Sequence, residues 1–145
     1  MLREVKIDCY HYFVDDQHQI QGEYKSWRED GSAYEHCFYL NDELHGIYTR
    51  WHTNGNRWLY IEYTHGLMTG EHKIWNKDDL LVTHCLHRND KLHGEYRDWD
   101  ENGQLSTHCF YINYVPVSLN TLPYPITGED RFYFTLKYDL QLLPI

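Results

Sequence analysis

The sequence predicts an all-β protein, an elongated single-layer twisted antiparallel sheet of tandem β-hairpin repeats of 24 residues that ends in a C-terminal cap. Two observations support this fold class. A glycine recurs every 24 residues, and a tryptophan follows each glycine by five residues. A fixed period of this size indicates one supersecondary unit stacked on copies of itself. The repeated residues are Gly22, Gly46, Gly70 and Gly94, followed by Trp27, Trp51, Trp75 and Trp99.

Each unit contains a turn dipeptide at a constant place after the tryptophan. These dipeptides are Asp30-Gly31, Asn54-Gly55, Asp78-Asp79 and Asn102-Gly103. Asn-Gly and Asp-Gly tolerate positive φ at both central positions of a type I′ turn, so we expect a two-residue hairpin turn in each unit. With this turn, Trp51 is predicted to face Trp58, and Tyr48 to face Ile61, across the hairpin.

The predicted register sorts side chains onto two faces, since residues two apart share a face. We expect one face to carry Trp27, Lys25 and His36, then Trp75, Lys73 and His84, then Trp99, Arg97 and His108. We expect the other face to pair Tyr24 with Cys37, Tyr48 with Ile61, His72 with Cys85 and Tyr96 with Cys109. The leading glycines are predicted to lie opposite Tyr39, Tyr63, His87 and Tyr111, whose rings could cover the bare backbone.

The chain is expected to form a single domain over 1–145. A strand over 5–14 supplies the second half of a leading half-repeat in 1–21, and four repeats fill 22–113. The remaining segment, 114–145, is predicted to be a C-terminal cap that begins with a proline-containing connector. Within the cap, a strand over 131–138 and a short helix that starts near 127 are alternatives, because period-two alternation and a capping-box pattern both occur there.

Composition excludes several classes of partner. The formal net charge is −9, whereas binding to nucleic acid depends on Lys and Arg that neutralise phosphates. An anionic membrane surface is disfavoured for the same reason. Neither a stretch of about 20 apolar residues nor a signal-peptide core is visible, so we expect an intracellular, cytoplasmic protein. The four cysteines are expected to be free thiols, because equivalent positions of neighbouring hairpins lie about 9.6 Å apart.

The pattern G-x-Y-x-x-W-x-x-x-G, seen at 46–55 and 94–103, resembles the MORN repeat family. It is most similar to the second MORN variant, which occurs in bacterial antitoxin-like proteins and in large DNA viruses. The resemblance covers 22–113 and implies an elongated twisted sheet of successive hairpins. It implies no single activity, since MORN repeats occur in scaffolds, in regulatory segments and in lipid-associated proteins.

The histidines and cysteines do not suggest a metal site or a catalytic site. Neighbours such as His36 and Cys37 point to opposite faces of a strand, and the spacing between repeats is too large for shared zinc ligands. His72 beside Cys85 is the one plausible cross-strand pair, and we interpret it as packing with a hydrogen bond. A nucleophile needs a base and an orienting group, but the cysteines form a periodic structural column. We therefore expect no metal, no cofactor and no enzymatic activity.

The function predicted from these patterns is binding. We expect a non-catalytic scaffold or interaction module that binds a protein partner or a second copy of itself, for example as a dimer through its ends. Trp and Tyr dominate binding hot spots. The candidate groove residues are Trp27, Trp51, Trp75 and Trp99, together with Tyr24, Tyr48 and Tyr96. Two alternatives rest on the resemblance: an antitoxin-like neutraliser of a protein toxin, active in the host cytoplasm if a virus encodes it, and a phospholipid-associated adaptor.

Overall fold

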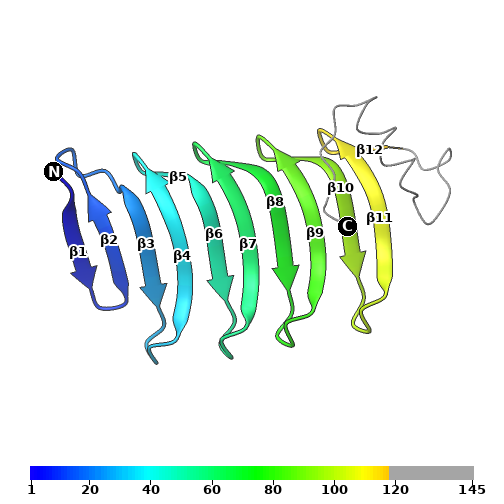
Figure 1. Cartoon of the computed structure of the whole chain (residues 1–145), viewed down its shortest axis with the longest axis horizontal. Coiled ribbons are helices and arrows are strands. Elements are labelled where there is room, and N and C mark those ends of the chain that lie inside the picture. The colour runs from blue at the N-terminus through cyan, green and yellow to red at the C-terminus, as the bar shows by residue number, and fades with distance from the viewer. Residues whose placement is uncertain (118–145) are drawn as a thin grey trace.

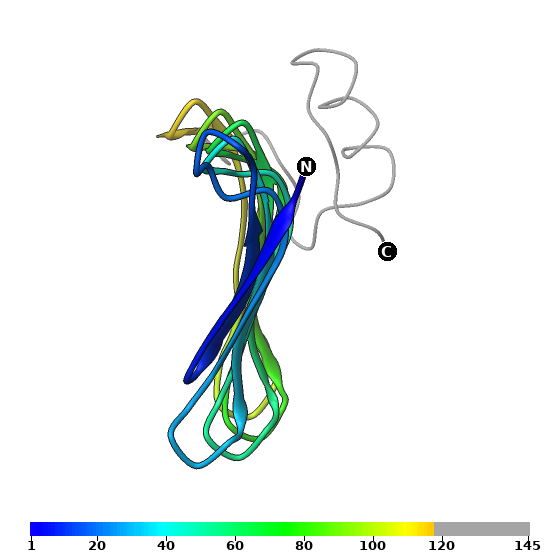
Figure 2. The same ribbon diagram turned by 90° about the vertical axis from the view of Figure 1, so that its left-hand side faces the viewer.

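The computed structural model describes residues 1–117, which form one open antiparallel sheet of 12 strands. The strands lie side by side in chain order, apart from the short β5, which pairs with β4 at one end (Figure 1). Seen along the row of strands, the sheet is a single twisted layer (Figure 2). The all-β fold class predicted from the 24-residue period is therefore confirmed. The two alternatives for the cap lie outside the described residues.

The hairpins follow the repeat. The strands are β1 (Arg3–Ile7), β2 (Tyr10–Val14), β3 (Gly22–Trp27), β4 (Ala33–Leu40), β5 (Glu43–Leu44), β6 (Gly46–Trp51), β7 (Arg57–Thr64), β8 (Leu67–Trp75), β9 (Leu81–Arg88), β10 (Lys91–Trp99), β11 (Leu105–Ile112) and β12 (Val115–Pro116). Each repeat of 22–113 thus begins its first long strand at or near the leading glycine and ends it at the tryptophan. Since the described residues contain only strands and turns, none of them forms a helix that could cross a membrane.

The predicted register holds along most of each hairpin and fails at the tryptophan. Tyr48 faces Ile61 as expected, but Trp51 faces Arg57 because a bulge shifts the register after Arg50. The same shift pairs Trp27 with Ala33, Trp75 with Leu81 and Trp99 with Leu105. The prediction that Trp51 faces Trp58 is therefore wrong by one residue.

The turn at the hairpin tip explains the shift. His52 donates its N–H to Asn56 O, and Gly55 donates its N–H to His52 O, at 2.8 and 3.0 Å. Gly55 has a φ of +86°, whereas Asn54 is not among the residues with positive φ. This is a three-residue loop with one left-handed residue, rather than a two-residue type I′ turn. The Asn54 side chain also donates to Lys77 O in the next repeat, at 2.7 Å, which favours this loop.

Two-residue turns with positive φ at both positions do occur, but at the opposite end of the strands. They connect one repeat to the next at Asn41-Asp42, His65-Gly66 and Asn89-Asp90, and a further one, Asn113-Tyr114, follows the last repeat. Asp90 donates its N–H to Met68 O at 3.0 Å, and its carboxylate accepts the Met68 N–H at 2.8 Å. Asp42 makes the same pair of bonds with Ile20, at 3.1 and 2.6 Å. These aspartates tie successive repeats together.

The N-terminal segment differs from its prediction. The expectation of one strand over 5–14 is wrong, because a turn at Asp8 and Cys9 divides it into β1 and β2. Asp8 has a φ of +44°, a conformation that aspartate adopts more readily than most residues. The first repeat is therefore preceded by a hairpin rather than by a single strand.

The leading glycines pair as predicted, and their backbone gives a further reason for them. Gly46 lies opposite Tyr63 and has a φ of +101°, which L side chains rarely adopt. The ring of Tyr63 packs against Tyr48, with centroids 6.0 Å apart. At Gly70 (φ +100°), an added Cβ would lie 1.9 Å from a carboxylate oxygen of Glu62. The positive φ therefore favours glycine at both positions, and at Gly70 a side chain would also clash with Glu62.

Candidate functional site

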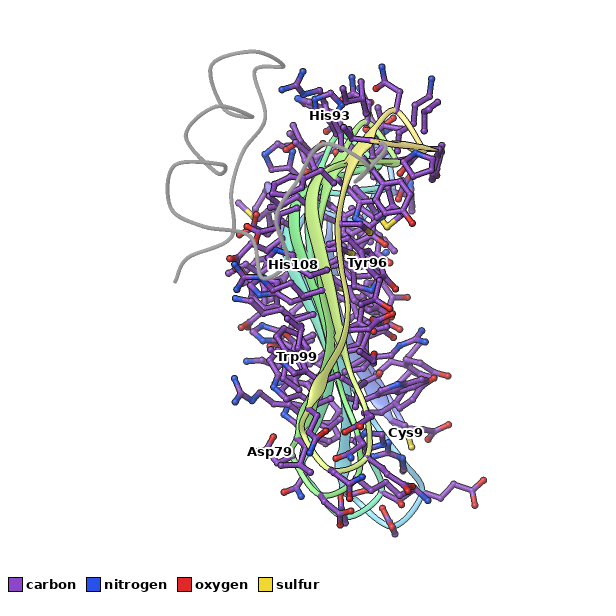
Figure 3. The ribbon with its side chains drawn as sticks, turned by 90° about the vertical axis from the view of Figure 1, so that its right-hand side faces the viewer. Cys9, Asp79, His93, Tyr96, Trp99 and His108 are labelled. Atoms are coloured by element: carbon purple, nitrogen blue, oxygen red, sulfur yellow. The ribbon has the colours of Figure 1, made fainter. Side chains whose placement is uncertain are left out.

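The side chains of the sheet separate onto two faces. We call one the tryptophan face, defined by Trp27, Trp51, Trp75 and Trp99, and the other the tyrosine face, defined by Tyr24, Tyr48 and Tyr96. Trp99 and His108 project from one side of the sheet and Tyr96 from the other (Figure 3). The seven predicted groove residues therefore do not line one groove.

The tyrosine face carries the hydrophobic cluster of the first two repeats. Cys37, Tyr48 and Ile61 are buried and form a hydrophobic cluster. Arg50 closes one end of it, since its guanidinium carbon lies 5.3 Å from the ring centroid of Tyr48 and its nitrogen lies 3.5 Å from a carboxylate oxygen of Glu35. Burial raises the pKa of Cys37 to about 12.

The tryptophan face carries a groove of about 320 Å³ at the first two repeats. Trp27 of β3 and Trp51 of β6 lie on its two sides, and Ala33 of β4 lies between them. The other lining residues are Lys25, Ser26, Glu35 and His36.

Ala33 is the reason why the groove is open here. The residues that face the tryptophan in the later repeats are larger: Arg57, Leu81 and Leu105. Arg57 extends over Trp75, the tryptophan of the following repeat, with its guanidinium carbon 4.6 Å from the ring centroid. Trp75 is 8% exposed. Ala33 has no side chain that could cover Trp51 in the same way.

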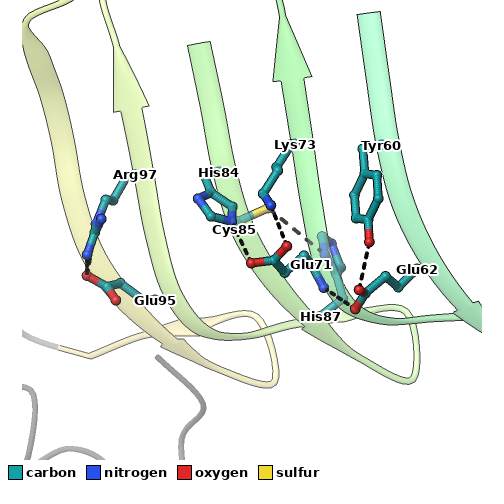
Figure 4. Close-up of polar contacts among 9 residues, drawn as sticks. All are labelled: Tyr60, Glu62, Glu71, Lys73, His84, Cys85, His87, Glu95 and Arg97. Carbon is teal, nitrogen blue, oxygen red and sulfur yellow. Dashed lines mark hydrogen bonds and ion pairs between the residues drawn. The ribbon is translucent and has the colours of Figure 1, made fainter. Parts of the chain in front are cut away.

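A polar column runs beside the tryptophans and repeats in three of the four units. A glutamate accepts hydrogen bonds from a lysine or arginine and lies within bonding distance of a histidine. These sets are Glu23 with Lys25 and His36, Glu71 with Lys73 and His84, and Glu95 with Arg97 and His108. Figure 4 shows the second set and part of the third. Each glutamate thus pairs with its basic neighbour, and Glu95 is fully buried.

The charges of this column are balanced locally. Burial raises the pKa of Glu71, but the hydrogen bond from Lys73 and the charges of Lys73 and His84 outweigh it and hold the pKa below its usual range. Burial, followed by the charge of Lys73, lowers the pKa of His84. A histidine that favours its neutral form beside a glutamate–lysine pair is a structural arrangement.

The cysteines and one group of histidines complete the polar inventory. All four cysteines are free, as expected. On the tyrosine face, His72, Cys85 and His87 bring their ligand atoms within 4.8 Å of one another. Sequence reasoning considered His72 and Cys85 but missed His87 as their neighbour. The available signal was the spacing of His87 two residues after Cys85, on the same face of one strand.

Comparisons with known proteins identify the repeat. The family model described as MORN repeat variant matches residues 44–65 and 92–113. These segments include parts of the second and fourth predicted units. No curated protein and no solved structure matches the chain. The 24-residue hairpin units at these positions are thus MORN repeats of the variant type, as the Gly-Tyr-Trp-Gly pattern predicts.

Proposed function

We propose that this chain is a non-catalytic interaction module that binds a protein partner through the groove between Trp27 and Trp51. MORN repeats are generally protein-interaction modules, which supports the class of function. The position of the groove follows from the geometry of the tryptophan face. The single observation that carries the proposal is Ala33, the one small residue in a column that otherwise holds Arg57, Leu81 and Leu105.

The groove suits an apolar side chain of the partner. Trp27 and Trp51 are partly exposed, and tryptophans that line a pocket are typical anchors of protein interfaces. Lys25 and His36 supply polar groups around it, which resembles the polar rim of an interface. The net charge of −9 favours a partner with a basic surface around its apolar anchor, since complementary potentials speed association.

A substitution that closes the groove tests this proposal. Ala33→Leu places in the first repeat the residue that Leu81 and Leu105 provide in the third and fourth, so the hairpin should still form. Full-length protein carrying Ala33→Leu, or Trp27→Ala together with Trp51→Ala, should lose a stoichiometric partner that wild-type protein captures from an extract of the native host. With the partner then purified, titration should show at least about 10-fold weaker binding, because an interface hot spot contributes about 2 kcal/mol or more.

The matched control is Trp58→Ala. Trp58 is 36% exposed and lies near Arg50 of the tyrosine face, whose guanidinium carbon is 5.9 Å from the indole centroid. This variant should bind the partner like the wild type. Equal binding by wild type and Ala33→Leu would refute the groove as the binding site, and loss of binding in Trp58→Ala alone would move the site to the other face.

The absence of catalysis and the cytoplasmic location are parts of the same proposal. Burial, followed by the charge of Glu35, raises the pKa of Cys37, and burial also raises that of Cys109. Such thiols are poor nucleophiles at neutral pH, since the thiolate is the reactive form. Free thiols in a chain with four cysteines suit a reducing compartment.

Self-association through the ends of the sheet is a second candidate. Within residues 1–117, β1 pairs only with β2, so its outer edge can accept another strand. Arg3, Glu4 and Lys6 lie on this strand, and charged edge residues discourage such pairing. Light scattering of the full chain is the direct test, and a monomer at all concentrations would exclude this candidate. The antitoxin-like and phospholipid-associated alternatives stay predictions from the family resemblance.

A further inference from the structure

The third repeat departs from the others at one pair of aromatic positions on the tyrosine face. In each of the other repeats the tyrosine two residues after the leading glycine packs against the tyrosine that lies opposite that glycine. These pairs are Tyr24 with Tyr39, Tyr48 with Tyr63, and Tyr96 with Tyr111. In the third repeat the same positions hold His72 and His87, with ring centroids 5.3 Å apart. A departure at both members of a pair, in an otherwise periodic face, calls for a reason particular to this repeat.

Cys85 completes a compact group with the two histidines. It pairs with His72 across β8 and β9 and precedes His87 by two residues on β9, so all three side chains share one face. The sulfur of Cys85 lies 4.0 Å from Nδ1 of His87, a contact drawn in Figure 4. One ligand atom from each residue lies within 4.8 Å of the other two. Among residues 1–117 this is the one such group of three.

The group is buried, and part of its hydrogen-bonding capacity is unused. Cys85 is 2% exposed and His87 is 9% exposed. Both ring nitrogens of His72 are buried without a hydrogen-bond partner. An unsatisfied buried polar group destabilises a fold. Tyrosine fits this position in the other three repeats, so a histidine here points to a ligand for its nitrogen.

We propose that His72, Cys85 and His87 form a binding site for a divalent metal ion of the zinc class. Two imidazole nitrogens and one thiolate are ligands that zinc prefers, at about 2.0–2.3 Å. Tetrahedral geometry at these lengths sets ligand atoms about 3.3–3.7 Å apart, so small side-chain rotations would bring the present group into place. Three protein ligands leave a fourth position for water or an exogenous ligand. This proposal reverses our expectation from the sequence, which considered His72 and Cys85 as an isolated pair.

The charge state of the thiol is compatible with the site. Burial raises the pKa of Cys85 to about 12, so the thiol keeps its proton when no ion is bound. A bound dication deprotonates a coordinating thiol, and the proton is released to solvent. The site lies on the face opposite the Trp27–Trp51 groove, and it does not depend on the proposed partner binding.

Metal titration of the full-length protein tests the site. Protein purified under reducing conditions and stripped with a chelator is titrated with Co²⁺ and then with Zn²⁺. We expect one equivalent of Co²⁺ to bind with the absorption of a tetrahedral ion and a thiolate-to-cobalt charge-transfer band, and one equivalent of Zn²⁺ to displace it. Absence of Co²⁺ and Zn²⁺ binding in the wild type would overturn the proposal.

Residues borrowed from the other repeats supply the variants. His72→Tyr with His87→Tyr recreates the tyrosine pair of the fourth repeat, and Cys85→Ile introduces the residue that Ile61 provides in the second. Each should melt cooperatively and bind zinc more than about 100-fold more weakly than the wild type, since even indirect partners of metal ligands contribute 10- to 100-fold. Unchanged affinity in the double tyrosine variant contradicts the assignment.

The control addresses adventitious binding by surface histidines. His45 and His65 form a second close pair, with centroids 4.9 Å apart, and His65 is 64% exposed in its side chain. His45→Ala should leave the stoichiometry, affinity and charge-transfer band unchanged. If His45→Ala abolishes binding, the ion sits at the surface pair, and the buried site is refuted. The cobalt band depends on a thiolate, so it distinguishes the two sites even if a core variant proves unstable.

Discussion

Arg57 lies over the indole of Trp75, with its guanidinium carbon 4.6 Å from the ring centroid. Arg57 belongs to the second repeat and Trp75 to the third, so one repeat covers the tryptophan of the next. The contact links the stacking of repeats to the groove, because the equivalent position one repeat earlier is Ala33. Trp75 is therefore covered by the neighbouring repeat, whereas Trp27 and Trp51 border an open groove.

Replacing Arg57 with alanine should uncover Trp75. We expect a loss of about 0.5–1 kcal/mol in the free energy of unfolding, the usual contribution of a cation–π contact near the surface. We also expect stronger acrylamide quenching of tryptophan fluorescence. Arg57→Leu is the control, because Leu81 and Leu105 occupy this column in other repeats, and it should restore most of the shielding. Equal quenching of wild type and Arg57→Ala would show that Arg57 does not cover the ring in solution.

Glycines with similar backbone conformations should respond differently to alanine. Gly46→Ala places a Cβ no nearer than 3.8 Å to Phe38, so the expected loss is the conformational part alone, about 1–2 kcal/mol at positive φ. Gly70→Ala places its Cβ 1.9 Å from the Glu62 carboxylate, which accepts the Glu71 N–H at 2.9 Å. Displacement of this carboxylate adds about 1.5–3 kcal/mol.

Urea unfolding of the two glycine variants measures the difference. Glu62→Ala in the Gly70→Ala background provides a double-mutant cycle. We expect strong coupling between these two substitutions, since the clash disappears with the carboxylate. Similar losses for Gly46→Ala and Gly70→Ala, without coupling to Glu62, would show that only backbone conformation matters at Gly70.

The sheet could be predicted from the sequence because residues that recur at the same place in every repeat indicate a series of equivalent hairpins. A two-residue turn at Asn54-Gly55 placed Gly46 opposite Tyr63 and Tyr48 opposite Ile61. Both pairs are observed, because the bulge after Arg50 compensates for the longer loop. The tip of the hairpin was not predictable to one residue, because Asn-Gly is compatible with a two-residue and with a three-residue turn. The bond from Asn54 to Lys77 in the next repeat favours the longer loop, and a single hairpin sequence does not reveal such a contact.

The candidate sites were harder to predict for a related reason. A search for repeated residues directs attention to what is constant, whereas both sites arise where the repeat is broken. Ala33 opens the groove because it is small in a column of larger side chains. His87 was interpreted as a variant of the tyrosine column that pairs with the leading glycines, so its proximity to Cys85 was overlooked. Exceptions within a column are therefore as informative as the column itself.

The aspartates between repeats should be important for stability. Asp90→Ala removes the carboxylate that accepts the Met68 N–H at 2.8 Å, and it places alanine at a φ of +66°. Both effects should lower the free energy of unfolding by about 2–4 kcal/mol in total. Asp90→Asn keeps a side-chain oxygen and tolerates left-handed backbone, so it should lose less than about 1 kcal/mol. Urea denaturation of both variants measures this, and equal losses would assign the effect to charge rather than to turn geometry.

The buried thiol of Cys37 should make the protein sensitive to alkaline pH. Burial raises the pKa of Cys37 from 9.0 to about 12. Between these values the unfolded chain releases the thiol proton while the folded chain retains it, so the free energy of unfolding falls as the pH rises. From pH 8 to pH 10 the titration of Cys37 should lower the free energy of unfolding by about 1 kcal/mol. Tyr39, whose pKa burial also raises to about 12, adds to the fall above pH 10.

Cys37→Ala tests this contribution. The variant should be less stable than the wild type at pH 8 because packing is lost. Between pH 8 and pH 10 its free energy of unfolding should fall by about 1 kcal/mol less than that of the wild type. Parallel pH profiles for wild type and Cys37→Ala, measured by urea unfolding in reducing buffer, would mean that this thiol titrates alike in the folded and unfolded chains.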